Sequence, residues 1–348
     1  MAHKVDVAPA LVAWHARHGR HDLPWQRDRT PYRVWISEIM LQQTQVATVL
    51  AYFDRFITRF PDLPALAAAP LDEVLHLWSG LGYYSRARNL HRAAQLVVAE
   101  HAGELPADTA TLATLPGIGR STAAAIRALS AGDRAAILDG NVRRVLARLF
   151  SVTGVTTQRA MQERLWELAE ACTPGRNVAV YTQAIMDLGA TVCVHRRPLC
   201  PVCPLQRDCG ARRSGRQHEI PAARPRAVRR TRSVVMLLAR QHDGSVLLER
   251  RAERGVWGGL WCPPQFPSVE AARLFAQTRL RGAEVEPQSR TILRHAFTHF
   301  ELEISPLLAR CAGWNGVMDG PPVLWYNPAS PQRLGLPAPV TALIQSIS

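Results

Sequence analysis

A chain of 348 residues, 47% apolar and 20% charged, is long enough for two or three domains with proper cores. Its net charge of +14 favours polyanions, of which nucleic acid is the commonest large one; an Arg-rich composition without such a partner is the alternative. No run of 18 apolar residues occurs and the first 20 residues lack an apolar signal region. We therefore expect no membrane span or secretory leader, and a cytoplasmic protein.

The first part of the chain, about residues 1–210, is expected to be all α-helical. A helix should begin at Thr30-Pro31, where a cap residue precedes a proline at the first helical position. Apolar residues then recur at helical spacing from Tyr32 to Phe60, and further helical segments follow as far as residue 189. No strand-like alternation occurs there. Helices in such a string must bury their apolar stripes on one another.

A change of composition follows at residues 211–232, which hold eight arginines, one acidic residue and two prolines. This predicts an extended basic linker, either a solvated spacer or a segment that also lies along DNA phosphates. After it, 233–240 and 246–251 flank a turn and predict a hairpin. A helix near 268–281, strands at 289–297 and 299–310 and a helix near 338–347 complete a small α+β domain over 233–348.

Four cysteines stand in a 17-residue run with the spacing C-x6-C-x2-C-x5-C: Cys193, Cys200, Cys203 and Cys209. Structural zinc sites usually pair two knuckles across a longer stretch. A single CxxC with one more distant cysteine on each side instead favours a loop around one 4Fe-4S cluster. Zinc and a chance cluster of buried thiols stay as alternatives. Thiolate ligation and unpaired cysteines both fit a reducing compartment.

A glycine turn, Leu115-Pro116-Gly117-Ile118-Gly119, joins two helical segments and is followed by Arg120 and Ser121. Gly117 and Gly119 let backbone N–H groups approach an anion closely at the start of a helix. This is the hairpin of helix-hairpin-helix DNA binders, which holds phosphate without reading sequence. Glycine also occurs in ordinary helix connections, so the prediction of a phosphate-binding hairpin rests on the whole string and not on one glycine.

Two carboxylates are candidates for acid–base work. Glu38 lies within an uncharged helical stretch, and desolvation there would raise its pKa, as suits a general acid. Asp139 immediately precedes a helix, where N–H groups would keep it ionised and able to stabilise a cation. The alternatives are an exposed glutamate and a plain N-cap. Opposite protonation states in two carboxyl groups are what cleavage of a glycosidic bond needs.

Two further sets of residues are candidates for contact with bases. Tyr83 follows a glycine-rich turn, and an aromatic side chain at a loop tip can wedge between bases; a core position is the alternative. Gln42 and Gln43 either probe base edges or face solvent.

Together these strings resemble the helix-hairpin-helix glycosylases of the endonuclease III superfamily, which carry an iron–sulfur cluster. The match runs in order over about residues 10–210, and within the superfamily the chain is similar to the MutY-type adenine DNA glycosylases. The matching strings are SEIMLQQTQV, SGLGYYSRARNL, LPGIGRSTAAAI, LDGNVRRVLARLF and the cysteine loop. Ser121 stands where bifunctional relatives have a lysine that attacks the sugar.

The resemblance implies a multidomain protein: a six-helix module of about residues 28–135, an iron–sulfur module of 1–27 plus 136–210, and a Nudix-like domain. The candidate Nudix helix at 268–275 lacks the glutamate-rich magnesium motif, so we expect a reader and not a hydrolase. The string RHAFTH resembles the family's 8-oxoguanine recognition loop, with Thr298 where serine is more usual, between Phe297 and His299.

The implied function is excision of adenine mispaired with 8-oxoguanine or guanine in double-stranded DNA, by a monomer with one 4Fe-4S cluster. Glu38 would protonate the flipped adenine, Asp139 would stabilise the sugar cation, and Asn141 would orient Asp139 or the DNA backbone. Arg196 and Arg197 would contact phosphate. Two alternatives remain: a bifunctional pyrimidine glycosylase-lyase, disfavoured by Ser121 and the extra domain, and a non-catalytic damage binder, disfavoured by the two carboxylates.

Overall fold

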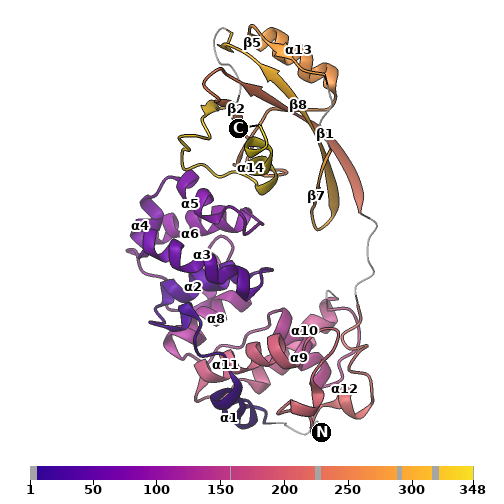
Figure 1. The fold of residues 1–348 in the computed structure, drawn as a ribbon. Coiled ribbons are helices and arrows are strands. Elements are labelled where there is room, and N and C mark those ends of the chain that lie inside the picture. The colour runs from indigo at the N-terminus through magenta and orange to yellow at the C-terminus, as the bar shows by residue number, and fades with distance from the viewer. Residues whose placement is uncertain (1–5, 157, 224–228, 288–291, 316–320, 348) are drawn as a thin grey trace. The chain divides into compact units, whose positions relative to one another are not determined.

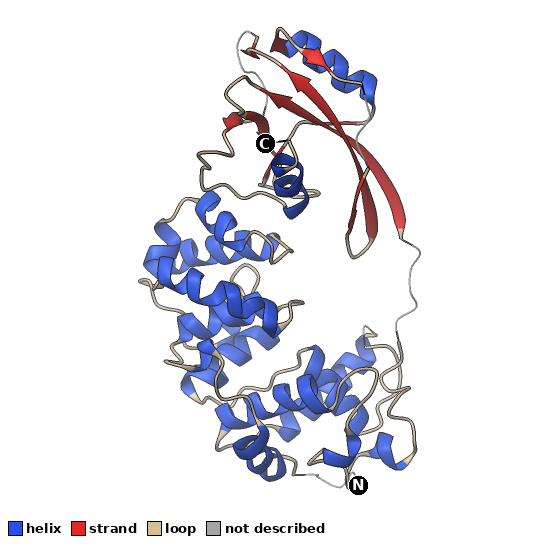
Figure 2. Ribbon diagram, viewed as in Figure 1, coloured by secondary structure: helices blue, strands red, loops and turns tan. Residues whose placement is uncertain are grey.

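The computed structural model describes residues 6–156, 158–223, 229–287, 292–315 and 321–347. These residues form two compact units, each described separately below. Unit 1 comprises residues 1–68 and 89–225, and unit 2 comprises residues 69–88 and 226–348. Figure 1 labels many of the elements and colours the chain by residue number, and Figure 2 colours the helices, strands and loops. None of the described helices is long and apolar enough to span a membrane.

Unit 1 is helical, as the sequence predicts (Figure 2). Its first elements are α1 (Ala8–His18), a 3-10 turn (Pro24–Gln26), α2 (Pro31–Leu41), α3 (Val46–Arg59) and α4 (Leu63–Ala68). After the segment assigned to unit 2 come most of α6 (Ser85–Glu100), α7 (Thr109–Leu112), α8 (Arg120–Ala131), α9 (Gly140–Leu149), α10 (Arg159–Cys172) and α11 (Val178–Asp187). A π-helical turn (Leu188–Val192), a 3-10 turn (Cys200–Val202) and α12 (Gly210–Arg213) follow.

The predicted helical run from Tyr32 to Phe60 is two helices. Thr30 caps α2 as expected, because its hydroxyl accepts the Arg33 N–H at 3.2 Å. The chain then leaves the helix after Leu41, and Gln43 takes a left-handed φ of 58°. Residues 42–45, Gln-Gln-Thr-Gln, are all polar and interrupt the apolar spacing at this break. The break turns the glutamines of the run into a loop at the end of α2.

The predicted hairpin between α7 and α8 is present. Gly117 has a φ of 80°, and a Cβ there would lie 3.0 Å from Cβ of Asn89. Gly119 precedes α8 with extended backbone, and a Cβ there would meet no heavy atom within 4 Å. The turn therefore requires glycine at the first position and tolerates a side chain at the second.

Unit 2 is built on a mixed sheet with the strand order β10-β2-β1-β8-β6. Its long strands, β1 (Arg230–Arg240) and β8 (Phe300–Arg310), pair in parallel from Arg230 opposite Phe300 to Arg240 opposite Arg310. The other named strands are β2 (Val246–Arg250), β3 (Trp261–Cys262), β4 (Gln265–Phe266), β5 (Leu280–Arg281), β6 (Glu284–Val285), β7 (Leu293–Ala296), β9 (Gly313–Trp314) and β10 (Val323–Tyr326).

The predicted hairpin of unit 2 is formed by β1 and β2, which are antiparallel with Arg240 opposite Val246. Helix α13 (Val269–Arg279) covers a core of buried side chains from β1, β2 and β8, and α14 (Ala338–Gln345) ends the chain. The predicted strand at 289–297 begins partly outside the described residues and continues as β7. A small α+β domain is thus confirmed.

The division of the chain differs from the expected one at residues 69–88, which include α5 (Leu71–Trp78) and belong to unit 2. The reason is packing and hydrogen bonding. Trp261 donates to the Asp72 carboxylate at 3.1 Å, and Arg333 pairs with Glu73 at 2.8 Å. Of the predicted linker at 211–232, residues 224–228 lie outside the described residues, and β1 begins at Arg230.

We expect Gly117→Ala to destabilise the protein by about 1–2 kcal/mol, because a left-handed backbone is costly for any residue with a Cβ. Contact with Asn89 adds to this cost. Urea unfolding of both proteins would measure the difference. Gly119→Ala is the matched control and should cost less than about 1 kcal/mol. Equal losses in the two variants would contradict the assignment of Gly117 as the strained position.

Candidate active site

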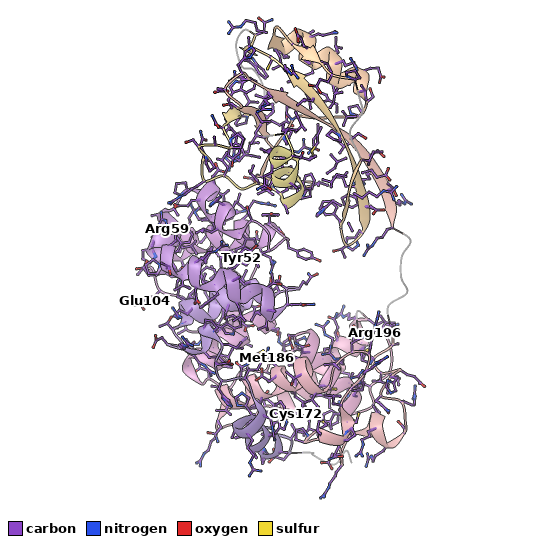
Figure 3. All side chains as sticks on the ribbon, in the orientation of Figure 1. Tyr52, Arg59, Glu104, Cys172, Met186 and Arg196 are labelled. Carbon is purple, nitrogen blue, oxygen red and sulfur yellow. The ribbon has the colours of Figure 1, made fainter. Side chains whose placement is uncertain are left out.

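A cavity of about 450 Å³ in unit 1 brings together most of the predicted catalytic residues. It is lined by residues from the end of α2, the loop after it, the start of α8, the start of α9, and α11. The predicted residues among its lining are Glu38, Gln42, Gln43, Ser121, Asp139 and Asn141. Met186 of α11, labelled in Figure 3, also lines it. Segments distant in sequence thus converge on two carboxyl groups.

Glu38 lies in the last turns of α2, between the buried residues Ser37 and Ile39. Its side chain is partly accessible, and it lines the cavity. Burial, and then the negative charge of Asp139, raise the pKa of Glu38 from 4.5 to about 7. The predicted upward shift is therefore found with the predicted cause, and Glu38 can carry a proton near neutral pH.

Asp139 is the N-cap of α9. Its carboxylate accepts the Val142 N–H at 2.8 Å. Burial raises the pKa of Asp139, while the N–H groups of Val142 and Asn141 and the charges of Arg144 and Arg143 lower it. The net direction is upward, which differs from our expectation of a carboxylate simply held ionised. The donors and cations beside Asp139 oppose the effect of burial on its pKa. At Glu38, the charge of Asp139 adds to the effect of burial. Both carboxyl groups therefore have a raised pKa, and of the two only Asp139 has donors and cations that oppose the effect of burial.

Ser121 fixes the segment that leads to Asp139. Its hydroxyl accepts the Leu138 N–H at 3.0 Å, which ties α8 to the residue before the cap. Gln42 donates from its amide to the Thr122 hydroxyl at 3.4 Å, and Gln43 is exposed in the loop after α2. The bond to Thr122 places Gln42 beside the start of α8, where the hairpin turn ends, and Gln43 lines the same cavity.

Two residues that the sequence analysis missed, Arg20 and Gln183, also line the cavity. Both are held by Asp187, which is completely buried. Arg20 donates to this carboxylate from its backbone N–H at 2.8 Å and from Nε at 2.9 Å, and the Gln183 amide donates at 2.9 Å. No local sequence signal marks this group, because its members are up to 167 positions apart.

The four predicted cluster cysteines line one small cavity of unit 1 with Arg148 and Arg212 and without any carboxylate. Arg148 is buried, and its guanidinium donates to Cys193 Sγ at 3.3 Å and to the carbonyls of Val194 and His195. Burial, and then the neighbouring thiols, raise the pKa of Cys203 to about 11. The loop therefore gathers four sulfurs around one space.

Among the described residues, no three His, Cys, Asp or Glu side chains are placed to hold a metal ion directly. A single zinc ion would draw four sulfurs to about 2.3 Å from one centre. A cluster of several irons places its own atoms between the thiolates and asks less of their mutual approach. Four thiolates without a carboxylate, beside two arginines, fit the donor set and the negative charge of such a cluster.

Arg196 and Arg197 lie in the cysteine loop and are exposed (Figure 3 labels Arg196). Gly117 and Gly119 are also exposed, at the hairpin turn. These four residues are outside the lining of the catalytic cavity. Their positions on the surface leave them accessible to a phosphate backbone.

In unit 2, Tyr83 meets the predicted recognition loop. Its hydroxyl is 2.9 Å from the Thr298 hydroxyl, and the Tyr83 side chain is 45% exposed. Tyr83 has a left-handed φ of 48°, next to Gly82 at 72°. Phe297 stacks on Phe300 with ring centroids 4.5 Å apart, and His299 is exposed at the tip between β7 and β8. The turn after α5 thus presents Tyr83 to Thr298.

Known protein families match both the helical part and the mixed-sheet part of the chain. Residues 36–171 match the HhH-GPD superfamily of base excision DNA repair proteins, and residues 235–346 match the NUDIX domain family. Among solved structures, a thermostable thymine-DNA glycosylase is 28% identical and matches 61% of this chain and 97% of its own, with a TM-score of 0.55. A non-covalent endonuclease III–DNA complex shares the fold, at 23% identity over 62% of this chain and 99% of that one and a TM-score of 0.52.

Curated relatives match most of the chain. The adenine DNA glycosylase of Buchnera aphidicola subsp. Acyrthosiphon pisum is 36% identical over 339 residues, which are 97% of this chain and 96% of the relative. The human adenine DNA glycosylase is 43% identical over 62% of this chain and 41% of its own length. The cavity with two carboxyl groups, the hairpin and the mixed-sheet unit are all features of the matched regions. The chain therefore belongs to the adenine DNA glycosylase family.

Proposed function

We propose that the protein removes adenine mispaired with 8-oxoguanine or guanine in double-stranded DNA, by monofunctional hydrolysis of the N-glycosidic bond. The proposal rests on one cavity that is lined by two carboxyl groups. Donors and cations oppose the effect of burial on the pKa of Asp139, whereas the charge of Asp139 adds to the effect of burial at Glu38. Such a pair can supply a proton to a leaving group and a negative charge to a sugar cation. Family membership supports adenine as the base removed.

The reaction begins with adenine out of the base stack and inside the cavity. The protonated Glu38 donates to N7 of adenine while the C1′–N9 bond breaks, and the bonding electrons leave with the base. Asp139, ionised at the N-terminus of α9, stabilises the sugar cation. Water adds to C1′ and its proton passes to Glu38, which restores the starting state. Asn141 holds the start of α9 in place through its bond from Arg144 at 2.8 Å.

DNA contacts are assigned to the exposed residues of unit 1. The backbone at Gly117 and Gly119 would bind phosphate at the hairpin, and Arg196 and Arg197 would bind it at the cysteine loop. Gln42 and Gln43 line the cavity. There they would contact the bases on either side of the extruded adenine. Net charge of +14 supports binding that depends on salt.

Monofunctional chemistry is supported by the lysine content. A lyase forms a Schiff base through an amine, yet Ser121 stands at the expected position and its hydroxyl accepts the Leu138 N–H. The chain has 41 arginines and one lysine, Lys4. A guanidinium stays protonated and cannot serve as that amine. In a bifunctional enzyme, the amine that forms the Schiff base would have to come from Lys4 or from the terminal amine.

The cluster is assigned to Cys193, Cys200, Cys203 and Cys209, and it would supply structural cross-linking of the loop, since hydrolysis moves no electrons. Arg148 holds the loop at Cys193 and neighbouring carbonyls. The 8-oxoguanine recognition is assigned to Phe297, Thr298 and His299, with Tyr83 beside Thr298.

We expect Glu38→Gln to lower the single-turnover rate of adenine excision by about 10²–10⁴-fold while duplex binding is retained, because the proton donor is lost. In the wild type, kcat/KM should fall as pH rises through about 7, where Glu38 loses its proton. Glu104→Gln, an exposed residue labelled in Figure 3, is the matched control and should behave as wild type. Similar rates in both variants would remove Glu38 from the proposed role.

Metal analysis should find about four irons per chain and a yellow-brown protein. Cys203→Ser should lose iron and thermal stability. Cys172→Ser, which changes a buried thiol of α10 labelled in Figure 3, should keep the iron. One zinc and no iron after anaerobic purification would establish the zinc alternative instead.

Thr298→Ala combined with His299→Ala should reduce the preference for adenine opposite 8-oxoguanine over adenine opposite guanine. A lost hydrogen bond to a base costs about 1–3 kcal/mol. Excision and binding on both mispairs would measure it, and the excision rate on the adenine–guanine mispair should stay near that of the wild type. An unchanged preference would show that this loop does not read the lesion.

A further inference from the structure

Asp187, the last residue of α11, is a buried carboxylate that takes no part in the proposed proton transfers. Its side chain is completely inaccessible to solvent. It accepts the Arg20 backbone N–H at 2.8 Å, Nε of Arg20 at 2.9 Å and the Gln183 amide at 2.9 Å. A buried charge is costly unless it is paired and hydrogen-bonded. Both partners of Asp187 line the catalytic cavity, so the carboxylate can act on the cavity through them.

Arg20, and not His15, balances the charge of Asp187. The Arg20 guanidinium donates to Oδ1 of Asp187 from Nε and also from Nη2. His15 Nε2 lies 3.5 Å from Oδ2, and burial lowers the pKa of His15 more than the charge of Asp187 raises it. A guanidinium stays protonated, whereas a neutral imidazole carries no charge. Asp187 therefore has a permanent cation as its partner and can act as an ionised acceptor.

This acceptor fixes the orientation of the Gln183 amide. Gln183 precedes Asp187 by one helical turn and is itself buried. An ionised carboxylate can only accept hydrogen bonds, so the amide nitrogen must face Asp187 and the amide oxygen must lie on the other side. Because Gln183 lines the catalytic cavity, Oε1 is offered there as an acceptor. An amide that could rotate freely would offer either its oxygen or its nitrogen at the same place.

The end of α1 holds the cationic partner of Asp187 in place. Gly19, directly before Arg20, donates its N–H to the His15 carbonyl at 2.8 Å. A Cβ at Gly19 would lie 2.3 Å from Cδ2 of His15, so the chain passes close against this ring. The His15 ring also meets that of His21, with centroids 4.7 Å apart. The residues that lead into Arg20 are thus closely packed, which limits how far its guanidinium can move away from Asp187.

We propose that Asp187 is a positioning residue that selects bases with an exocyclic amino group, because it keeps Oε1 of Gln183 turned to the cavity. The N6 amino group of adenine can donate to this oxygen. The O6 carbonyl of hypoxanthine or guanine would meet it oxygen to oxygen, and a buried acceptor would be left unpaired. This inference rests on the proposed excision and adds a reason why an amino base is accepted. Asp187 acts through Gln183, since it is not among the residues that line the cavity.

Single-turnover excision by the full-length holoprotein tests the proposal, with adenine, hypoxanthine and unsubstituted purine each placed opposite 8-oxoguanine. The ratio of two rates on one preparation does not depend on the fraction of folded protein. Asp187→Asn keeps the size of the side chain but can donate to Oε1 of Gln183, which lets that amide reverse. The preference for adenine over hypoxanthine, and over purine, should fall by about tenfold.

Thr191→Val is the matched control. It removes the hydroxyl that donates to the backbone carbonyl of Asp187 at 2.8 Å and leaves the Asp187 carboxylate in place, so both preferences should stay as in the wild type. A double-mutant cycle then asks whether Asp187 acts through Gln183. Gln183→Leu should lower both preferences by itself, and Asp187→Asn should lower them no further in that background.

The proposal is overturned when Asp187→Asn keeps the wild-type preferences, when Thr191→Val lowers them equally, or when the effects of Asp187→Asn and Gln183→Leu add independently. If Asp187→Asn does not fold, unchanged preferences in Gln183→Leu overturn it as well. Excision of adenine by the wild type is measured in the same assay. Lack of that activity would contradict the proposed function, whereas unchanged preferences would contradict only the role of Asp187.

Discussion

The capping of α9 by Asp139 is the interaction on which the chemistry proposed for unit 1 depends. It places a carboxylate at the positive end of a helix and beside Arg143 and Arg144, while burial acts in the opposite direction. At Glu38 the first cause is burial and the second is the charge of Asp139 itself. The proposed reaction needs opposite protonation states, and the unequal surroundings of the two carboxyl groups favour them. In that reaction the charge that would stabilise the sugar cation would also keep the proton on Glu38.

Helix α9 also anchors the cysteine loop. Arg144 bonds to Asn141 in the first turn of the helix and, through Nε at 2.7 Å, to the carbonyl of Cys193. One turn later, Arg148 bonds to Cys193 Sγ. The close approach of Gly189 to Asn141, where a Cβ would lie 2.6 Å from Cβ of Asn141, completes the contact. A displacement of the cysteine loop would therefore move the first turn of α9, where Asn141 lies two residues from Asp139.

The features that could be predicted are defined by residues close together in sequence. The features that could not be predicted depend on contacts between distant segments. The hairpin string, the capping position of Asp139 and the cysteine spacing are each defined by neighbours in sequence, and the structure has the helices and strands that they imply. The break after α2 was missed although residues 42–45 are all polar, because the apolar residues on both sides of them were taken as one helical stripe. Arg20 and Gln183 reach the cavity through Asp187, a connection between distant segments that no periodicity records. A cavity of unit 2 is likewise lined by four separate segments, which include Tyr83, Arg232, Trp257 and Phe297.

Residues 69–88 group with the C-terminal part of the chain in the structure. Their pattern is helical, and the family resemblance assigns them to the helical module of about residues 28–135. Hydrogen bonds decide otherwise, because Asp72, Glu73 and Arg88 each hold a residue of the C-terminal part of the chain. Helix α6 then begins among unit 2 residues and ends in unit 1. Tyr83 stands directly before this helix and meets Thr298. A residue of the helical sequence motif thus belongs to the sheet unit, and the recognition site proposed for unit 2 includes a side chain from outside residues 226–348.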